Sequence, residues 1–226
     1  MYCNICDGTE FADYRGRPNE QCVQCKSKAR HRVGWDVYQA HLLPIFEHDP
    51  QARCLHLAPE KSLHGLLKPK LGARYITSDA APERYPHANC LKLYFPKDFE
   101  IFPDDYFSAI LHNHVLEHIP GSYRDHLRAF TRLLAPGGKM IFSIPGPYVG
   151  QRTVEGGEHL FSDAERLEKF LQGDHFKLIG EDLFETLDKL PGGQRIEEGV
   201  TNARRAELSV RKNKAPFFIW QKHSSD

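Results

Sequence analysis

Apolar residues in the central part of the chain form short continuous runs, separated by longer segments with helical spacing. The runs lie at residues 53–58, 75–78, 107–112 and 139–144, and each has the length of a buried strand. Strands that alternate with helices favour a mostly parallel sheet joined by right-handed crossovers. The pattern therefore predicts an α/β fold around a doubly wound sheet.

Four segments have the three- and four-residue apolar spacing of amphipathic helices. Their apolar faces are formed by Trp35, Tyr38, Leu42 and Ile45; by Leu63, Leu66 and Leu67; by Tyr123, Leu127, Phe130 and Leu134; and by Leu167, Phe170 and Leu171. The last helix follows Ser162 and Glu165, which have the spacing of a capping box. These helices are expected to cover the sheet.

The last quarter of the chain contains two further strand candidates, around residues 206–211 and 216–221, with a turn-like Lys-Asn-Lys between them. This pattern predicts an antiparallel hairpin at one edge of the sheet. The polar stretch 191–202 contains two adjacent glycines and is expected to be a mobile loop.

Length and charge limit the class of protein. A chain of 226 residues accommodates one medium domain and a small appendage. Lys+Arg and Asp+Glu both total 30, so bulk charge does not attract nucleic acid. No apolar run reaches the ~20 residues that span a bilayer, and the N-terminus lacks the features of a signal peptide. We expect a cytoplasmic protein without membrane contact.

Four of the six cysteines stand in two closely spaced pairs near the N-terminus, Cys3 with Cys6 and Cys22 with Cys25. Two such knuckles can complete a tetrahedron of thiolates around Zn²⁺ with no position open to water, which is the form of a structural site. The alternative is four unligated thiols. The zinc interpretation predicts a metal-binding module at residues 1–32, followed by the main domain at 33–226.

A basic cluster follows the second cysteine pair and comprises Lys26, Lys28, Arg30, His31 and Arg32. Such a cluster can contact a phosphate or an acidic substrate. An equally good interpretation is the solvated start of a helix. Nucleic acid binding through this cluster is therefore kept only as a minor hypothesis.

Two sequence motifs resemble those of a known family. The string Asp-Asp-Tyr-Phe-Ser-Ala-Ile-Leu-His-Asn-His-Val-Leu-Glu-His-Ile at 104–119, followed by Arg-Leu-Leu-Ala-Pro-Gly-Gly at 132–138, resembles the fourth- and fifth-strand motifs of class I methyltransferases. The resemblance covers about residues 50–180. It implies a seven-stranded Rossmann-like sheet and S-adenosylmethionine as the cofactor.

The resemblance also implies a cofactor site at the carboxyl ends of the strands, where open α/β sheets bind nucleosides. Asp79, at the end of the second strand, is expected to accept the ribose hydroxyls. Ala58, Pro59 and Glu60 are expected at the methionine end, where Glu60 faces the cofactor's ammonium group. The opposite side of the cofactor is assigned to Asn113 and His114.

The first loop departs from the family pattern, since residues 56–62 contain no glycine where the family usually has several. Glycines allow close backbone approach and unusual dihedral angles. We interpret this loop as a remodelled cofactor loop. The alternative is a fold that no longer binds cofactor.

Two histidines are the candidates for a catalytic base. Transfer to a hydroxyl requires a proton acceptor, and histidine titrates in a suitable range. His114 follows the fourth strand and His159 lies in the loop after the fifth, so both are expected at one crevice. Glu117 and His118 are interpreted as a helix start and are not assigned to catalysis.

These observations predict a methyltransferase that modifies an oxygen of a small molecule, such as a saccharide or a nucleotide-linked intermediate. One alternative is an RNA or protein methyltransferase that docks through its zinc module. Another is a non-catalytic zinc-bound interaction protein.

Overall fold

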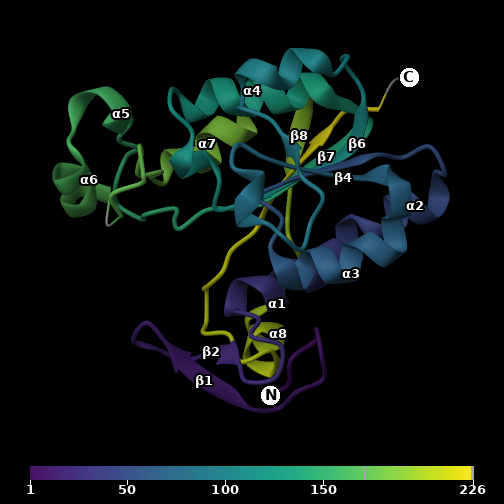
Figure 1. Cartoon of the computed structure of the whole chain (residues 1–226), viewed down its shortest axis with the longest axis vertical. Coiled ribbons are helices and arrows are strands. Elements are labelled where there is room, and N and C mark those ends of the chain that lie inside the picture. Colours follow the sequence, from purple (N-terminus) through teal and green to yellow (C-terminus); the bar gives the residue numbers. More distant parts are fainter. Residues whose placement is uncertain (171, 225–226) are drawn as a thin grey trace.

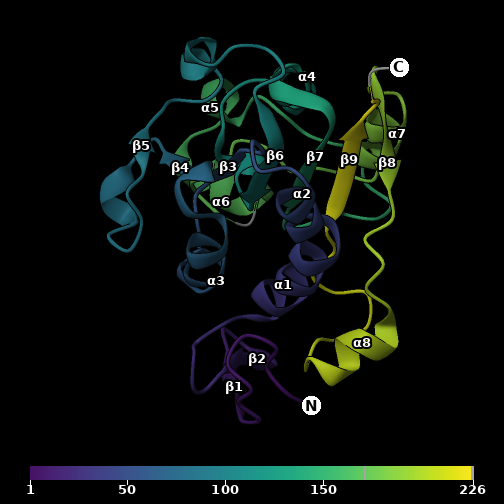
Figure 2. The same ribbon diagram turned by 90° about the vertical axis from the view of Figure 1, so that its right-hand side faces the viewer.

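A single seven-stranded sheet forms the centre of the computed structural model, which describes residues 1–170 and 172–224 (Figures 1 and 2). The strands are β3 (Cys54–Leu57), β4 (Tyr75–Asp79), β5 (Leu91–Lys92), β6 (Phe107–Asn113), β7 (Leu134–Ser143), β8 (Gly193–Ile196) and β9 (Phe218–Lys222). The order is β5-β4-β3-β6-β7-β9-β8. The predicted α/β class, the seven strands and the four central strand positions are confirmed.

Strands β3 to β7 run parallel, and β9 runs antiparallel to both β7 and β8. Leu57 at the end of β3 pairs with Ser78 of β4 on one side and with His112 of β6 on the other. The chain builds outward from β3 to β5, then crosses back to β6. The switch point therefore lies between β3 and β6, where ligands bind in such sheets.

Helices cover both faces of the sheet (Figure 1). They are α1 (Ala29–His41), α2 (Leu43–His48) and α3 (Lys61–Leu71) on one face, with α4 (Tyr123–Leu133) and α7 (Asp182–Asp188) on the other. Successive strand residues pack into opposite cores, because side chains alternate along a strand. In β6, for example, Ala109 and Leu111 join the core under α1 and α3, and Ile110 joins the core under α4.

The helix predictions are confirmed with two changes of boundary. The predicted first helix is divided at Leu42, because α2 begins with Pro44 in its first turn. Leu134 belongs to β7 instead of the preceding helix. Helix α6 (Asp163–Phe170) has the expected capping box, in which Ser162 and Glu165 bond reciprocally, whereas Leu171 lies outside the described residues.

The predicted C-terminal hairpin is wrong in one strand. The partner of β9 is β8, which lies inside the stretch expected to be a loop, whereas residues 202–207 form α8 (Asn202–Glu207). The Thr201 hydroxyl accepts a hydrogen bond from the Arg204 amide at 3.1 Å and caps this helix. Gly193 can pair at the start of β8 because it has no side chain; a Cβ at this position would collide with the Gln221 carbonyl.

The N-terminal segment forms a two-stranded antiparallel sheet of β1 (Phe11–Tyr14) and β2 (Arg17–Cys22) below the main sheet. Helix α8 packs beside it, although the two are almost 200 residues apart in sequence (Figures 1 and 2). The Tyr2 amide donates to the Glu207 carbonyl at 2.8 Å, and Asp36 of α1 accepts from Arg204 at 2.6 Å. The C-terminal segment thus fixes the module to the main domain.

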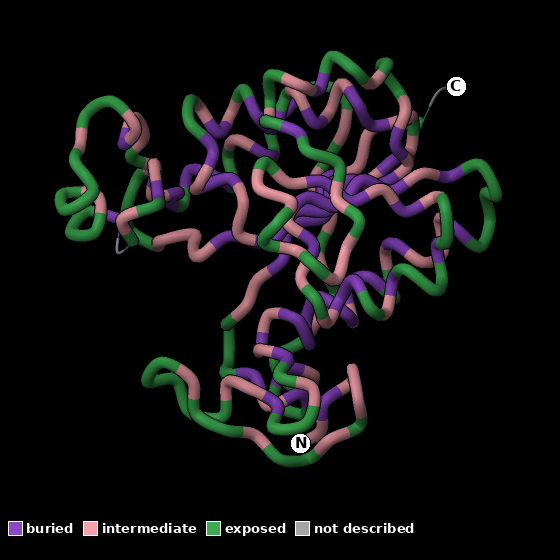
Figure 3. Tube along the Cα trace, viewed as in Figure 1, coloured by how far each residue is buried: buried purple, intermediate pink, exposed green. Residues whose placement is uncertain are grey.

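A long excursion containing α5 (Gly157–Leu160) and α6 leaves the sheet after β7. It stands out from the carboxyl ends of the strands, and few of its residues are buried (Figure 3). Short 3-10 turns complete the chain: η1 (Gly72–Arg74), η2 (Pro82–Arg84), η3 (Lys97–Ile101) and η4 (Leu116–His118). Among the described residues, no helix is both long and apolar enough to cross a bilayer.

Candidate active site

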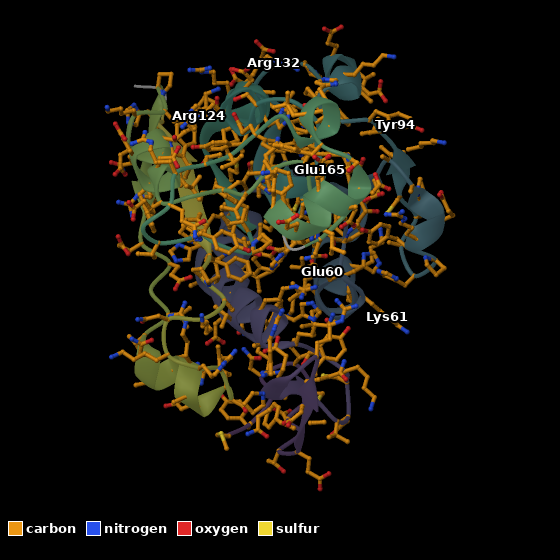
Figure 4. All side chains as sticks on the ribbon, turned by 90° about the vertical axis from the view of Figure 1, so that its left-hand side faces the viewer. Glu60, Lys61, Tyr94, Arg124, Arg132 and Glu165 are labelled. Atoms are coloured by element: carbon orange, nitrogen blue, oxygen red, sulfur yellow. The ribbon has the colours of Figure 1, made fainter. Side chains whose placement is uncertain are left out.

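The loops at the carboxyl ends of β3, β4 and β6 bring most of the predicted cofactor residues to one edge of the sheet. Figure 4 faces this edge, with the labelled Glu60 below Glu165 of α6. Ala58, Pro59 and Glu60 follow β3, Asp79 ends β4, and Asn113 ends β6. Because β3 lies between β4 and β6 in the sheet, these ends are neighbours.

Glu60 is the centre of a buried polar network. Its Oε2 accepts a hydrogen bond from Asn113 Nδ2 at 3.1 Å and lies 3.5 Å from His56 Nε2. Its Oε1 faces Arg30 Nε at 3.8 Å and His31 Nε2 at 4.0 Å, but it has no hydrogen-bond partner among the described residues. An orphaned carboxylate oxygen at this position fits the ammonium group of a bound amino acid.

Electrostatics keep Glu60 ionised although its side chain is only 13% exposed. Burial acts to raise its pKa, but the neighbouring His56, His31 and Arg30 outweigh burial and lower the pKa to about 2. Burial lowers the pKa of His31 to about 3, so its imidazole is neutral near pH 7. The site therefore presents one carboxylate charge beside the Arg30 guanidinium.

Asn113 connects this carboxylate to the surrounding elements. Its amide nitrogen also donates to the Tyr38 hydroxyl at 2.8 Å, and its Oδ1 accepts from Ser143 Oγ at 3.1 Å. Tyr38 belongs to α1 and Ser143 ends β7. All polar atoms of the Asn113 side chain are thus engaged, and its position is fixed by three elements.

Two non-glycine residues with left-handed backbone conformation terminate the adjacent strands β3 and β6. Ala58 has φ = 50° and His114 has φ = 53°, a region that costs roughly 1–2 kcal/mol for such residues. Both turns are held by backbone bonds: the Ala58 amide donates to Ser78 and the His114 amide to Ser143. Ala58 therefore adopts, without glycine, the type of conformation that glycine usually provides.

Asp79 is half-buried at the end of β4, where its Oδ1 accepts from the Ala81 amide at 2.7 Å. The segment after it folds back over the first loop, since His87 Nε2 lies 2.8 Å from the Pro59 carbonyl. Burial, followed by the charges of Asp79 and Glu60, raises the pKa of Tyr85. The Tyr85 ring packs edge-on against His87 with ring centroids 6.0 Å apart.

The two histidines predicted to be catalytic make no contact with each other in the part of the chain that the structure describes. His114 has a side chain that is 30% exposed, with Nδ1 at 3.5 Å from Glu117 Oε1. His159 lies on α5 with a side chain that is 82% exposed, and its charged neighbour is Glu158 at 3.9 Å. His114 follows Asn113, which donates to Glu60, so His114 is the nearer of the two to the network around Glu60 along the chain.

The four N-terminal cysteines form one cluster, with their Sγ atoms all within 4.8 Å of one another. The closest pairs are Cys3 with Cys25 and Cys6 with Cys22, each at 3.6 Å. Thiolates around Zn²⁺ at about 2.3 Å lie roughly 3.8 Å apart in a tetrahedron. The spacing and the all-sulfur donor set therefore fit a zinc ion.

The basic cluster serves mostly structural contacts. Arg32 is fully buried and donates to four backbone carbonyls, those of Glu20, Ser27, Leu208 and Ser209. Arg30 and His31 face Glu60. Of the five residues in the cluster, Lys26 alone is exposed to solvent.

Sequence reasoning missed several site residues that come from outside the recognised motifs. Tyr38 and His31 were assigned to a packing helix and a basic cluster, and His56 to a buried strand. Tyr85 and His87 lie in an irregular segment without a periodic signal. The sequence signal that could indicate these site residues is the number of histidines and tyrosines at residues 56–87. Which of them contact Glu60 or the first loop depends on tertiary packing.

Comparisons with known proteins agree with this architecture. A family described as "Methyltransferase domain" matches residues 45–185. A SAM-dependent methyltransferase from Archaeoglobus fulgidus superimposes with a TM-score of 0.54 at 15% identity, covering 85% of this chain and 94% of the other. The CurJ carbon methyltransferase gives a TM-score of 0.52 at 16% identity over 86% of this chain and 56% of the other. A search of curated proteins gave no match.

Proposed function

We propose that this chain, which belongs to the methyltransferase-domain family, uses S-adenosylmethionine to methylate an oxygen of a small molecule, such as a saccharide or a nucleotide-linked intermediate. The observation that carries the proposed site is the position of Glu60 at the switch point of the sheet: a largely buried, ionised carboxylate whose Oε1 has no hydrogen-bond partner among the described residues. Asp79 lies at the end of the adjacent strand.

The residues divide the tasks of binding. Glu60 holds the ammonium group of the cofactor, and Asp79 accepts its ribose hydroxyls by charge-assisted hydrogen bonds. Asn113, fixed by Tyr38 and Ser143, keeps Glu60 in place.

The bound cofactor supplies a methyl carbon already activated by the adjacent sulfonium. The chain then has to align the acceptor and remove its proton. His114 is the proposed base, because it is partly exposed beside the cofactor residues. His159, on the exposed excursion, is proposed as an acceptor contact.

We further propose that Cys3, Cys6, Cys22 and Cys25 hold a structural zinc ion. Four thiolates leave no open coordination position, so the ion takes no part in catalysis. It stabilises the module that carries the start of α1, and α1 contributes Arg30, His31 and Tyr38 to the active site.

A methyl-transfer assay on three fractions of one cell extract tests the acceptor class. Purified protein is incubated with methyl-labelled S-adenosylmethionine and a small-molecule, an RNA or a protein fraction. We expect the label in the small-molecule fraction, with the transferred methyl group bound as an ether. Label in RNA or protein would overturn the proposal and favour docking through the module, and absence of label in all three would favour a non-catalytic protein.

A further inference from the structure

A second cluster of metal-ligating side chains lies at the carboxyl end of the sheet, outside the cofactor site. Glu117, His118 and His175 each present one donor atom, and these atoms all lie within 4.8 Å of one another. If an ion lies about 2.1 Å from each donor, two donors can be at most roughly 4.2 Å apart. The distances between the donor atoms of this cluster are therefore close to those of ligands that share one ion. Two imidazoles and one carboxylate with open positions are a known binding set for divalent transition metals.

The Glu117 carboxylate lacks the partners that a buried charge needs. Its residue is only 2% exposed, and neither Oε1 nor Oε2 has a hydrogen-bond partner among the described residues. Burying an unpaired carboxylate is strongly unfavourable. The buried Lys177 does not compensate it by an ion pair, because its ammonium donates to the carbonyls of Ile119 and Gly121. A cation at Glu117 would supply the missing interaction.

The backbone holds the two histidines in place. The Phe176 amide donates to the Glu117 carbonyl at 2.8 Å, which places His175 beside η4. The two imidazole rings lie 4.7 Å apart and nearly perpendicular. His118 Nδ1 lies 3.0 Å from the Asp174 carbonyl, and donation to that carbonyl leaves Nε2 free to bind a metal. Metal-binding histidines commonly have such an outer hydrogen bond.

The adjoining space admits an ion and excludes an organic ligand. Glu117 and His175 line a small hollow together with Tyr148 and Lys177. Its volume of ≈ 10 Å³ corresponds to about one water molecule. The hollow is also next to the proposed base, since Glu117 Oε1 lies 3.5 Å from His114.

We propose that Glu117, His118 and His175 bind one divalent transition-metal ion, at a site separate from the four-cysteine module. Glu117 and His175 also line the hollow, so the ion would lie beside it, and water would complete the remaining coordination positions. This inference does not rest on the proposed acceptor or on cofactor binding. It concerns only the side chains of η4 and of the loop after α6.

Titration with Mn²⁺ tests the site, because thiolates of the cysteine module bind this ion poorly. Electron paramagnetic resonance of free Mn²⁺ reports binding to the full-length protein. We expect one bound Mn²⁺ per chain. In Glu117→Gln the affinity should fall by more than ~10-fold, since loss of an outer-shell partner alone costs about 10- to 100-fold. His118→Asn, at a side chain that is 36% exposed, provides a second variant with little risk to folding.

Two controls separate this site from the rest of the protein. The exposed His223→Asn and the module variant Cys22→Ser should retain Mn²⁺ binding. Absence of Mn²⁺ binding to the unmodified protein, or equal binding by Glu117→Gln and His118→Asn, would overturn the inference. S-adenosylhomocysteine is titrated in parallel, so a protein that binds this nucleoside but no Mn²⁺ refutes the metal site alone.

Discussion

The Asn113 side chain donates a hydrogen bond to Glu60 Oε2 at 3.1 Å and thereby links the ends of β6 and β3 across the switch point. The two residues are 53 positions apart in sequence. Neither residue is a glycine, yet their contact joins two strand ends of the proposed cofactor site.

Asp79→Ala is expected to weaken binding of S-adenosylhomocysteine by about 1–3 kcal/mol, because charge-assisted hydrogen bonds to the ribose are lost. Isothermal titration calorimetry measures the change. Asp125→Ala is the matched control, since Asp125 is an exposed carboxylate paired only with Arg128. Equal affinity of the Asp79 variant and the control would place the sugar elsewhere.

Glu60→Gln is expected to change how stability depends on pH. The folded pKa of about 2 lies below the ordinary value of 4.5, so the carboxylate stabilises the fold above pH 4.5, and this contribution disappears as pH falls toward 2. The difference corresponds to about 3 kcal/mol. Urea unfolding at pH 3 and pH 6 measures it.

The Glu60 variant should lose less stability than the unmodified protein between these two pH values. Glu100→Gln, at an exposed glutamate, controls for the other acids. If Glu60→Gln follows the same pH profile as this control, Glu60 is not held ionised by its neighbours.

Ala58→Gly should stabilise the protein by up to about 1 kcal/mol. It removes the cost of a left-handed alanine, and the greater entropy of glycine in the unfolded chain offsets part of the gain. Guanidinium unfolding provides the free energy. Ala80→Gly has no positive φ to relieve and is expected to destabilise; a similar loss in both variants would contradict strain at Ala58.

His114→Asn should lower the rate of methyl transfer by about 10²–10⁴-fold, the usual contribution of a general base. Asparagine tolerates the left-handed backbone at this position, so the fold should change little. Once an acceptor is known, single-turnover rates measure the effect. An undiminished rate would transfer the role of base to another group, with His159→Ala as the comparison.

Cys22→Ser should release the zinc ion and loosen β1 and β2, because a three-thiolate site loses much of its affinity. Elemental analysis counts the metal per chain. Cys90→Ser is the control, since Cys90 lies outside the cluster. Zinc content that stays the same in both variants would exclude the four-thiolate site.

Local patterns in the sequence determined the strands β3, β4, β6 and β7, the helices that cover them and the cysteine cluster. These features depend on periodicity of two or 3.6 residues and on short spacings, so neighbouring residues specify them. The same reasoning failed at residues 206–211, where alternating polar and apolar residues imitate a strand. There α8 ends at Glu207 and the chain turns, an arrangement held by the Thr201 cap and by the contacts of α8 with the N-terminal module.

Tertiary structure alone decided which polar side chains meet. Glu60 with Arg30, and Glu117 with His175, are pairs from distant segments whose contact requires the completed sheet and its crossing loops. The sequence determined that carboxylates, imidazoles and thiols were present and at which strand ends they stood. Their burial, and with it their charge state and chemistry, was decided by packing, because only a desolvated group depends so strongly on its nearest partner.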